Sequence, residues 1–441
     1  MQKPFGTNAH GPRVDVAVVG GGLAGLTAAT YLARAGRRVR VFEKSRSCGG
    51  RAVTHIHGDF RFNLGPHALY KGGAALAILQ ELGIRVSGGT PGVSGAYAIE
   101  GDTTHTLPGG FVSLLTTGLL RLPAKFELAK LLGAVQKIDT QAIQPVSVRA
   151  WLETTLHQPE VRRFVQALLR LSTYANDPER QSAGAALAQL QAAVASGVMY
   201  LDGGWQVLVD GLQEAARTAG AEIESGARVA TVEHDGAVRA VALADGTRVA
   251  ATDVVIAGAP DDAAALAPAS SALRGWSAVA IPVKAACLDV ALSRLPRPRA
   301  TFALGIDQPL YFSVHSAVAR LAAPGGATLQ VAKYLAPGGS TAAKDDERQL
   351  EGVLDRLQPG WRDAVVERRF LPSMVVYNAL VTAAAGGVRG RPGPAVPDIE
   401  GVYVAGDWVG PVGGLADTSL ASAKHAAELI LQRSAAPAVA A

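Results

Sequence analysis

The feature that most constrains the fold is a set of spaced glycines between a buried strand and a helix. Residues 14–19, Val-Asp-Val-Ala-Val-Val, predict a buried strand, and residues 26–35 predict a helix. The six residues between them are Gly20, Gly21, Gly22, Leu23, Ala24 and Gly25, and they have the spacing G-x-G-x-x-G. At this spacing the first glycine makes a tight turn, the second lets a phosphate approach the backbone, and the third lets helix and strand pack closely. The sequence therefore predicts an α/β fold that begins with a Rossmann-like, dinucleotide-binding unit.

An acidic residue follows at the distance that such a unit requires. Glu43 ends a second predicted strand, residues 38–43, and stands 43 − 20 = 23 residues after the first glycine. A carboxylate at this place can accept hydrogen bonds from ribose hydroxyls, and it would repel a 2′-phosphate. The helix N-terminus offers free N–H groups to the phosphates. We therefore count Glu43 and the adjacent Lys44 among the cofactor-binding residues.

A glycine pair and an arginine come next, and they carry a family resemblance. The segment from Glu43 to Arg51 ends in Gly49-Gly50-Arg51. With the glycine motif before it, this segment resembles the flavin amine oxidase and phytoene desaturase superfamily of FAD-dependent oxidoreductases. The resemblance implies FAD as the cofactor, with Gly50 and Arg51 on its phosphate or flavin side. No Cys or His stands where it could form a bond to the flavin ring, and Cys48 lies at the phosphate side, so we expect non-covalent binding.

Further matching segments are spread over the chain. Residues 62–67 are similar to the family segment beside the flavin, where Asn63 stands in place of a frequent Asp. Residues 203–229 are similar to the return of the chain to the FAD domain, and residues 402–415 to its last strand and the approach to its last helix. The cofactor-binding residues that the resemblance adds are Gly65, Pro66, His67, Val229, Gly406, Asp407, Gly414 and Leu415.

The length predicts two structural units. A chain of 441 residues exceeds the size at which one hydrophobic core stops growing, about 250–300 residues. By the resemblance, residues 1–84, 201–260 and 386–441 form a discontinuous FAD-binding domain. Residues 85–200 and 261–385 form an inserted α+β substrate-binding domain.

Composition and charge exclude several classes of protein. Hydrophobic residues make up 49% of the chain and charged residues 18%, which excludes a disordered chain. The net charge of +5 is scattered without long runs of like charge, so we expect no nucleic-acid partner. Two cysteines without a metal-binding spacing, and an N-terminus without an apolar segment, indicate a reduced cytoplasmic protein with no metal site.

One helical stripe leaves contact with a membrane surface open. Its apolar members are Phe111, Leu114, Leu115, Leu119 and Leu122, and three basic residues lie nearby. A basic amphipathic helix binds the surface of a membrane. Glu127 and the apolar pair at 131–132 interrupt the basic face, so we favour a helix that covers the substrate cavity over a peripheral membrane contact.

The catalytic residues are less well defined. In amine oxidases of the superfamily a lysine lies near flavin N5, and the alignment places Val290 there, with Lys284 six residues earlier. This argues against ordinary amine oxidation. His67 is the candidate titratable group near the flavin, either as a base or hydrogen-bond donor or as a structural histidine.

These inferences combine into an expected function. We expect an FAD-dependent oxidoreductase that desaturates or oxidises a small, mainly apolar organic substrate by hydride transfer to flavin N5. Dioxygen, a quinone or another acceptor would then reoxidise the flavin. The alternatives are an amine oxidase with an altered active site and a non-redox, FAD-dependent isomerase.

Overall fold

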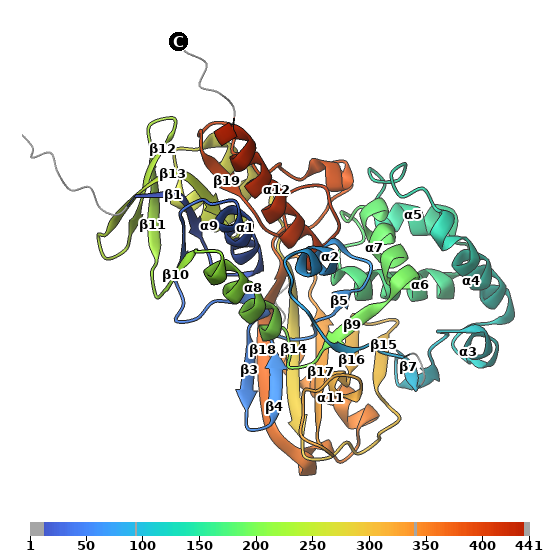
Figure 1. The fold of residues 1–441 in the computed structure, drawn as a ribbon. Coiled ribbons are helices and arrows are strands. Elements are labelled where there is room, and N and C mark those ends of the chain that lie inside the picture. Colours follow the sequence, from blue (N-terminus) through green and yellow to red (C-terminus); the bar gives the residue numbers. More distant parts are fainter. Residues whose placement is uncertain (1–12, 93–94, 339–341, 436–441) are drawn as a thin grey trace, which may run out of the picture.

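The computed structural model describes residues 13–92, 95–338 and 342–435 (Figure 1). The predictions for residues 1–12 and 436–441 lie outside this range. Two seven-stranded sheets organise the described chain, and a lobe of helices stands beside the second sheet. This arrangement confirms the predicted class, a Rossmann-like α/β unit combined with an α+β unit.

The first sheet is the predicted nucleotide-binding sheet. Its order is β10-β2-β1-β13-β12-β11, with β19 also beside β13. The strands β10, β2, β1, β13 and β19 run parallel, whereas β11 and β12 are antiparallel arms. Bounds are β1 Arg13–Val19, β2 Val39–Glu43, β10 Glu222–Ser225, β11 Val229–His234, β12 Val238–Leu243, β13 Arg248–Ile256 and β19 Val402–Val404.

The long strand β13 corrects one sequence prediction. The residue pattern predicts two strands, at 248–251 and 253–257, but residues 248–256 form one continuous strand. One edge of β13 pairs with β1 from Ala250 to Ile256. The other edge pairs first with β12, up to Ala250, and then with β19 from Val254 onward. The change of partner explains the change of pattern, because the two halves have different neighbours.

Helices cover both faces of the first sheet. On one face α1 packs against α8 and α12, and small residues such as Ala28 and Ala426 permit this close packing. On the other face α9 and α10 contribute Ala263, Leu266 and Leu273 to a core shared with β11, β13 and β19. Bounds are α1 Leu23–Arg34, α2 Ala74–Glu81, α8 Gln206–Thr218, α9 Pro260–Leu266, α10 Ser271–Val279 and α12 Leu415–Ala435.

The packing of α9 and α10 differs from the predicted division of the chain, which assigned residues from 261 onward to the substrate-binding part. Their apolar side chains are buried against the first sheet. We therefore propose a boundary near residue 280, where β14 enters the second sheet. The other boundaries remain predictions.

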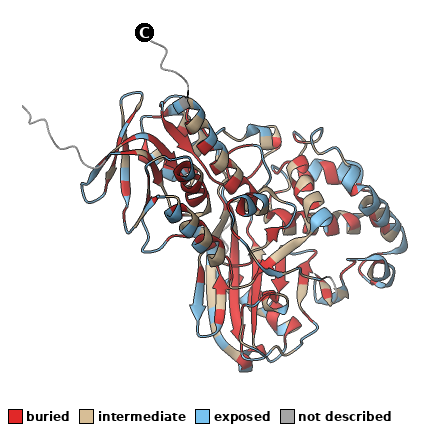
Figure 2. Ribbon diagram, viewed as in Figure 1, coloured by how far each residue is buried: buried red, intermediate tan, exposed pale blue. Residues whose placement is uncertain are grey.

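The second sheet has the order β18-β14-β17-β16-β15-β7-β8. Its strand β14 is buried along nearly its whole length because both faces of the sheet are covered (Figure 2). Bounds are β7 Ala96–Glu100, β8 Thr103–Thr106, β14 Val283–Leu292, β15 Phe302–Gly305, β16 Leu310–Ser313, β17 Ala327–Tyr334 and β18 Val365–Tyr377.

The helical lobe covers one face of this sheet and α11 covers the other. The lobe consists of α3 Phe111–Thr116, α4 Leu122–Ala134, α5 Val148–Thr155, α6 Pro159–Thr173 and α7 Ala183–Ser196, and α11 spans Ala343–Leu357. Two small sheets join the parts, namely β3 Thr54–His57 with β4 Phe60–Asn63, and β5 Leu69–Tyr70 and β6 Gly88–Gly89 on either side of β9 Val198–Leu201. Short 3₁₀ helices are η1 Gly50–Ala52, η2 Val135–Lys137, η3 His315–Ala317, η4 Trp361–Ala364 and η5 Gly387–Gly390.

A buried histidine lies where β9 meets the second sheet. His315 is 1% exposed, and its ring stacks on Tyr200 with the ring centres 3.8 Å apart. Its Nε2 lies 3.2 Å from the hydroxyl of Tyr311, which in turn lies 3.2 Å from the hydroxyl of Tyr200. Burial lowers the pKa of His315 to about 3 because a charged imidazolium would lose its hydration.

We predict that His315 makes the fold sensitive to acid. In the unfolded chain a histidine has a pKa near 6.5, so below this pH the unfolded state binds a proton that the folded state does not bind. The free energy of unfolding should therefore fall as the pH drops from 6.5, by about 1.4 kcal/mol per pH unit from this residue. His315→Phe keeps the stacking and removes the titration, so its urea-unfolding free energy should depend less on pH between about 6.5 and 4.5. Equal slopes for both proteins would refute this assignment.

Candidate functional site

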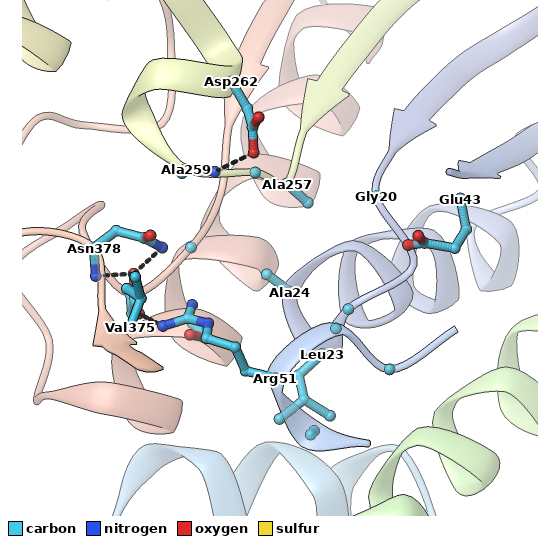
Figure 3. A pocket seen from close by; sticks show the side chains of 18 of the residues that line it. Gly20, Leu23, Ala24, Glu43, Arg51, Ala257, Ala259, Asp262, Val375 and Asn378 are labelled. Carbon is cyan, nitrogen blue, oxygen red and sulfur yellow. Dashed lines mark hydrogen bonds and ion pairs between the residues drawn. The ribbon is translucent and has the colours of Figure 1, made fainter. Parts of the chain in front are cut away.

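A cavity of about 760 Å³ connects the two units of the fold (Figure 3). It begins at the carboxyl ends of β1 and β2, where open α/β sheets bind their ligands. It ends between β18, the loop at residues 66–68 and the start of α12. Of the predicted cofactor-binding residues, all except Gly25, Gly65 and Gly414 line this cavity.

The glycine motif has the geometry that its spacing predicts. Gly20 has a φ of +108°, and a side chain there would meet the carbonyl of Ala257. A Cβ on Gly25 would lie 1.9 Å from the Gly20 carbonyl oxygen, so this position is needed for packing of the helix on the strand. Gly22 lines the cavity and directly precedes the first residue of α1. A Cβ on Gly22 would meet no atom within 4 Å. The open space at the N-terminus of α1 therefore suits a phosphate group.

Glu43 is nearly buried at the end of β2, with 6% of its surface exposed. Its Oε2 accepts a hydrogen bond from the Gly21 N–H and its Oε1 from the Ser45 N–H, both at 2.7 Å. These bonds hold the carboxylate at the cavity wall (Figure 3). Each oxygen keeps a further lone pair for a ligand hydroxyl.

The first sheet also contributes a segment that the sequence analysis missed. Ala257, Gly258 and Ala259 follow β13 and line the cavity, and Asp262 in the first turn of α9 lies beside them (Figure 3). Val229 and Lys44 complete this end, and the Lys44 ammonium lies 3.9 Å from the Asp262 carboxylate. Two features of the sequence could have indicated this segment: a glycine follows a buried strand, and a helix starts soon after that glycine.

Arg51 joins three segments in the middle of the cavity. Its Nη1 donates to Asp407 Oδ2 at 2.6 Å and to the Val376 carbonyl at 2.7 Å. Asp407 is 2% exposed, and its Oδ1 accepts from the side-chain amide of Asn378 at 2.9 Å. The Arg51 side chain is 40% exposed, so part of the guanidinium remains accessible from the cavity.

His67 is tied to the backbone. Its Nδ1 lies 3.1 Å from the Gly65 carbonyl and its Nε2 lies 3.2 Å from the Arg51 carbonyl. Its ring makes an edge contact with Trp205, with ring centres 4.9 Å apart. Burial lowers the pKa of His67, so the neutral ring satisfies one of the two carbonyls at a time. These contacts favour a structural role over the role of a base.

Gly65 lies just outside the cavity, above a buried ion pair. Its N–H donates to Asp289 Oδ2 at 3.2 Å, and the same oxygen accepts from Arg369 at 2.7 Å. A Cβ on Gly65 would lie 2.8 Å from the sulfur of Cys287. This face of β14 therefore presents Cys287 and Asp289 towards the loop beside the cavity.

The position of Val290 differs from the one expected from the alignment. Val290 packs in the core that includes Leu350 and Leu354 of α11, on the opposite face of the second sheet. The alignment places it at the cavity, but successive residues of a strand face opposite sides. Lys284 and Lys333 do not line the cavity either, and Lys333 pairs with Asp346 at 2.7 Å.

The start of α12 is held in an uncommon conformation. Leu415 lines the cavity and has a φ of +57°, which few residues other than glycine adopt. Arg391 Nη1 donates to the Gly413 carbonyl at 2.9 Å and to the Thr418 hydroxyl at 3.1 Å. These bonds fix the turn that precedes α12, and the helix begins at Leu415.

The far wall contains residues that no motif indicated. Tyr174 directly follows α6 with a φ of +59°, and its hydroxyl donates to the Pro66 carbonyl at 3.0 Å. Met374, Val375 and Val376 of β18 form the adjoining wall. Their sequence is an ordinary strand pattern, so nothing in the sequence alone marks them as cavity residues.

A parallel sheet whose strand ends and helix N-terminus open into a long cavity defines a dinucleotide-binding class of protein. Within this class the chain belongs to the family of flavin containing amine oxidoreductases, whose model matches residues 23–431. The family match confirms the predicted resemblance and implies a flavin cofactor.

Curated relatives match over parts of the chain. Phytoene dehydrogenase of Streptomyces griseus is 28% identical over 267 residues, which are 51% of this chain and 50% of that protein. A limonene dehydrogenase component of Castellaniella defragrans is 52% identical over 56 residues, 13% of this chain and 10% of that protein. The matched regions thus cover half or less of the length of these relatives.

Solved structures match over nearly the whole chain. Putrescine oxidase in complex with putrescine has a TM-score of 0.74 at 16% identity, covering 96% of this chain and 99% of that one. Cyclohexylamine oxidase from Brevibacterium oxydans has a TM-score of 0.73 at 18% identity, with 96% and 100% covered. At these identities the similarity shows the fold alone.

We predict that Glu43→Gln weakens flavin dinucleotide binding. The amide removes the negative charge and one acceptor, so charge-assisted hydrogen bonds of roughly 1.5–3 kcal/mol each are lost. The dissociation constant, measured by fluorescence titration of the apo-protein, should rise by about one to two decades. Glu222→Gln on the neighbouring strand β10, an exposed carboxylate, serves as the control and should leave the affinity unchanged. Equal affinities in the two variants would rule out Glu43 as the ribose ligand.

Proposed function

We propose that the chain binds FAD non-covalently in this cavity and oxidises a small, mainly apolar organic molecule by removing two hydrogens. The observation that carries the proposal is that the cavity end between β18 and α12 is mainly apolar and holds no unpaired carboxylate among the described residues. Its walls are Pro66, Ala68, Tyr174, Met374 and Val375, and its carboxylate, Asp407, is already paired with Arg51.

The residues present fit FAD along the whole cavity. The N-terminus of α1 and Gly22 would receive the pyrophosphate, and Glu43 the ribose next to it. Val229 and the segment 257–259 would surround the adenine, whereas Arg51 and the N-terminus of α12 would face the flavin end. The partial positive charge of that N-terminus favours a negatively charged pyrimidine ring.

Non-covalent attachment is supported by the positions of the nucleophiles. Cys48 and Cys287 are buried outside the cavity lining, and desolvation raises the pKa of each thiol. His67 lines the cavity, but both of its ring nitrogens lie beside backbone carbonyls. We therefore propose that neither the two cysteines nor His67 forms a covalent bond to the flavin.

The bound flavin supplies at N5 the acceptor for a hydride from an activated C–H bond. The residues of this chain would orient the substrate and exclude water, with Tyr174 and Met374 as the side chains next to it. An ammonium group would find no unpaired carboxylate among the described residues of this wall, and its desolvation costs several kcal/mol. Dioxygen, a quinone or another acceptor would reoxidise the flavin.

The names of the relatives agree with this proposal. One curated relative is a phytoene dehydrogenase and another is part of a limonene dehydrogenase. The putrescine and cyclohexylamine oxidases share the fold, and amine oxidation stays the alternative that the experiments below distinguish.

We predict that the purified protein is yellow and that acid precipitation releases its FAD intact. The expected result is a supernatant whose chromatographic retention and absorbance match those of FAD. Colour that stays with the precipitated protein would contradict non-covalent binding, and a colourless protein with no affinity for FAD would contradict the cofactor assignment.

We also predict that apolar compounds reduce the bound flavin faster than cationic amines do. The measurement is the anaerobic loss of flavin absorbance with two matched sets, partly saturated polyenes and heterocycles on one side, putrescine and cyclohexylamine on the other. Rapid bleaching by the amines alone would replace desaturation with amine oxidation. If neither set bleaches the flavin, whereas dithionite does, the non-redox alternative gains support over both.

A further inference from the structure

We propose that the outer end of the helical lobe docks onto the surface of a lipid bilayer that carries anionic headgroups. The contact surface is an apolar patch that consists of Phe111, Val112 and Leu115 on α3, and Leu122 and Phe126 on α4. Figure 1 shows both helices at the edge of the molecule, remote from the first sheet. The proposal is independent of the substrate assignment.

The patch is exposed although its residues are large and apolar. Phe111 is 77% exposed, Val112 72%, Phe126 70%, Leu122 65% and Leu115 54%. Most of the other strongly exposed apolar residues, such as Ile56 and Val279, lie on other elements. A cluster of this kind on two consecutive helices marks an interaction site, whereas single exposed residues need no explanation.

The same helices also possess a separate inner face. Leu114 and Leu119 of the predicted stripe, together with Leu128 of α4, are buried in the core of the helical lobe. Packing within this core, rather than against the cavity, accounts for these three residues. Phe111, Leu115 and Leu122 of that stripe are exposed, so packing within the lobe does not account for these three residues.

The charges around the patch favour an anionic partner. Arg121 is 87% exposed, Lys130 is exposed, and Lys125 lies between them with its ammonium donating to the Leu115 carbonyl. The nearby carboxylates are largely covered. Glu127 accepts from the N–H groups of His157 and Gln158, and Glu160 pairs with Arg121.

Charged groups on the neighbouring helices agree with this balance. On α6, Arg162 donates to the His157 carbonyl and Arg163 pairs with Glu100 of β7. Around the patch, the five cations named above thus outnumber the three carboxylates Glu100, Glu127 and Glu160, so positive charge is in excess at the rim. Apolar side chains surrounded by Lys and Arg are the composition of helices that lie in a membrane interface.

A lipid surface fits this patch better than a second copy of the chain. A twofold contact would place identical basic rims against each other, and their like charges would repel. The length of α4, 13 residues, corresponds to about 20 Å, which suits a helix lying in the interface. Among the described residues, no helix is both long and apolar enough to cross a bilayer.

The test is flotation of the full flavin-loaded chain with vesicles of phosphatidylcholine alone or mixed with phosphatidylglycerol. We expect binding to the mixed vesicles that weakens as salt is added. The triple variant Phe111→Ser, Leu122→Ser and Phe126→Ser should bind at least roughly tenfold more weakly. The control variant Ile56→Ser with Val279→Ser changes exposed apolar residues elsewhere and should bind like the natural chain.

A second variant tests the charges without altering the apolar residues. Lys125→Gln with Lys130→Gln should lose the preference for anionic vesicles. Circular dichroism and flavin content, unchanged in each variant, establish that the fold is retained. Absence of vesicle binding by the natural chain, or equal loss in the control variant, would overturn the proposal. A mass near twice 45.4 kDa that the triple variant reduces to the monomer would instead identify a second copy as the occupant and overturn it too.

Discussion

The buried carboxylate of Asp407 is the interaction on which the candidate site depends. It follows the last strand of the first sheet and accepts hydrogen bonds from Arg51 and from Asn378, which directly follows β18 of the second sheet. Arg51 also binds the backbone of β18 at Val376. Removing Arg51 would leave the buried carboxylate of Asp407 without its charged partner, which destabilises the folded state. One carboxylate thus fixes the relative position of both walls of the cavity.

The two ends of the cavity achieve their properties in different ways. At the nucleotide end, backbone N–H groups are available to a ligand, since α1 has no side-chain cap and the space beside Gly22 is open. At the other end, helix α12 begins at a strained Leu415 that Arg391 holds in place. A positive φ at a leucine persists only where the surroundings enforce it, and such positions concentrate at functional sites.

The helical lobe has an inner face and an outer face with different properties. Its inner side packs on the second sheet through Leu114, Leu128 and other buried residues, and Tyr174, directly after α6, lies in the cavity wall. Its outer side presents the apolar patch of α3 and α4. The separation of these faces within short helices is a consequence of helical periodicity, since residues three or four apart share a face and their neighbours do not.

The sequence alone determined the nucleotide end of this protein. The glycine spacing, the two buried strands and Glu43 lie close together in the chain, and local sterics oblige such a segment to form one structure. The resemblance added distant residues such as Val229 and Asp407, which the fold brings to the same cavity. Only the tertiary structure decided the rest. Tyr174 and Met374 reach the cavity through packing between segments 200 residues apart, 374 − 174, and α9 lies on the first sheet because of its apolar contacts. Likewise, Val290 faces away from the cavity because of the register of its strand. The strand is buried on both faces and consists largely of small and apolar residues, so its sequence pattern does not specify that register.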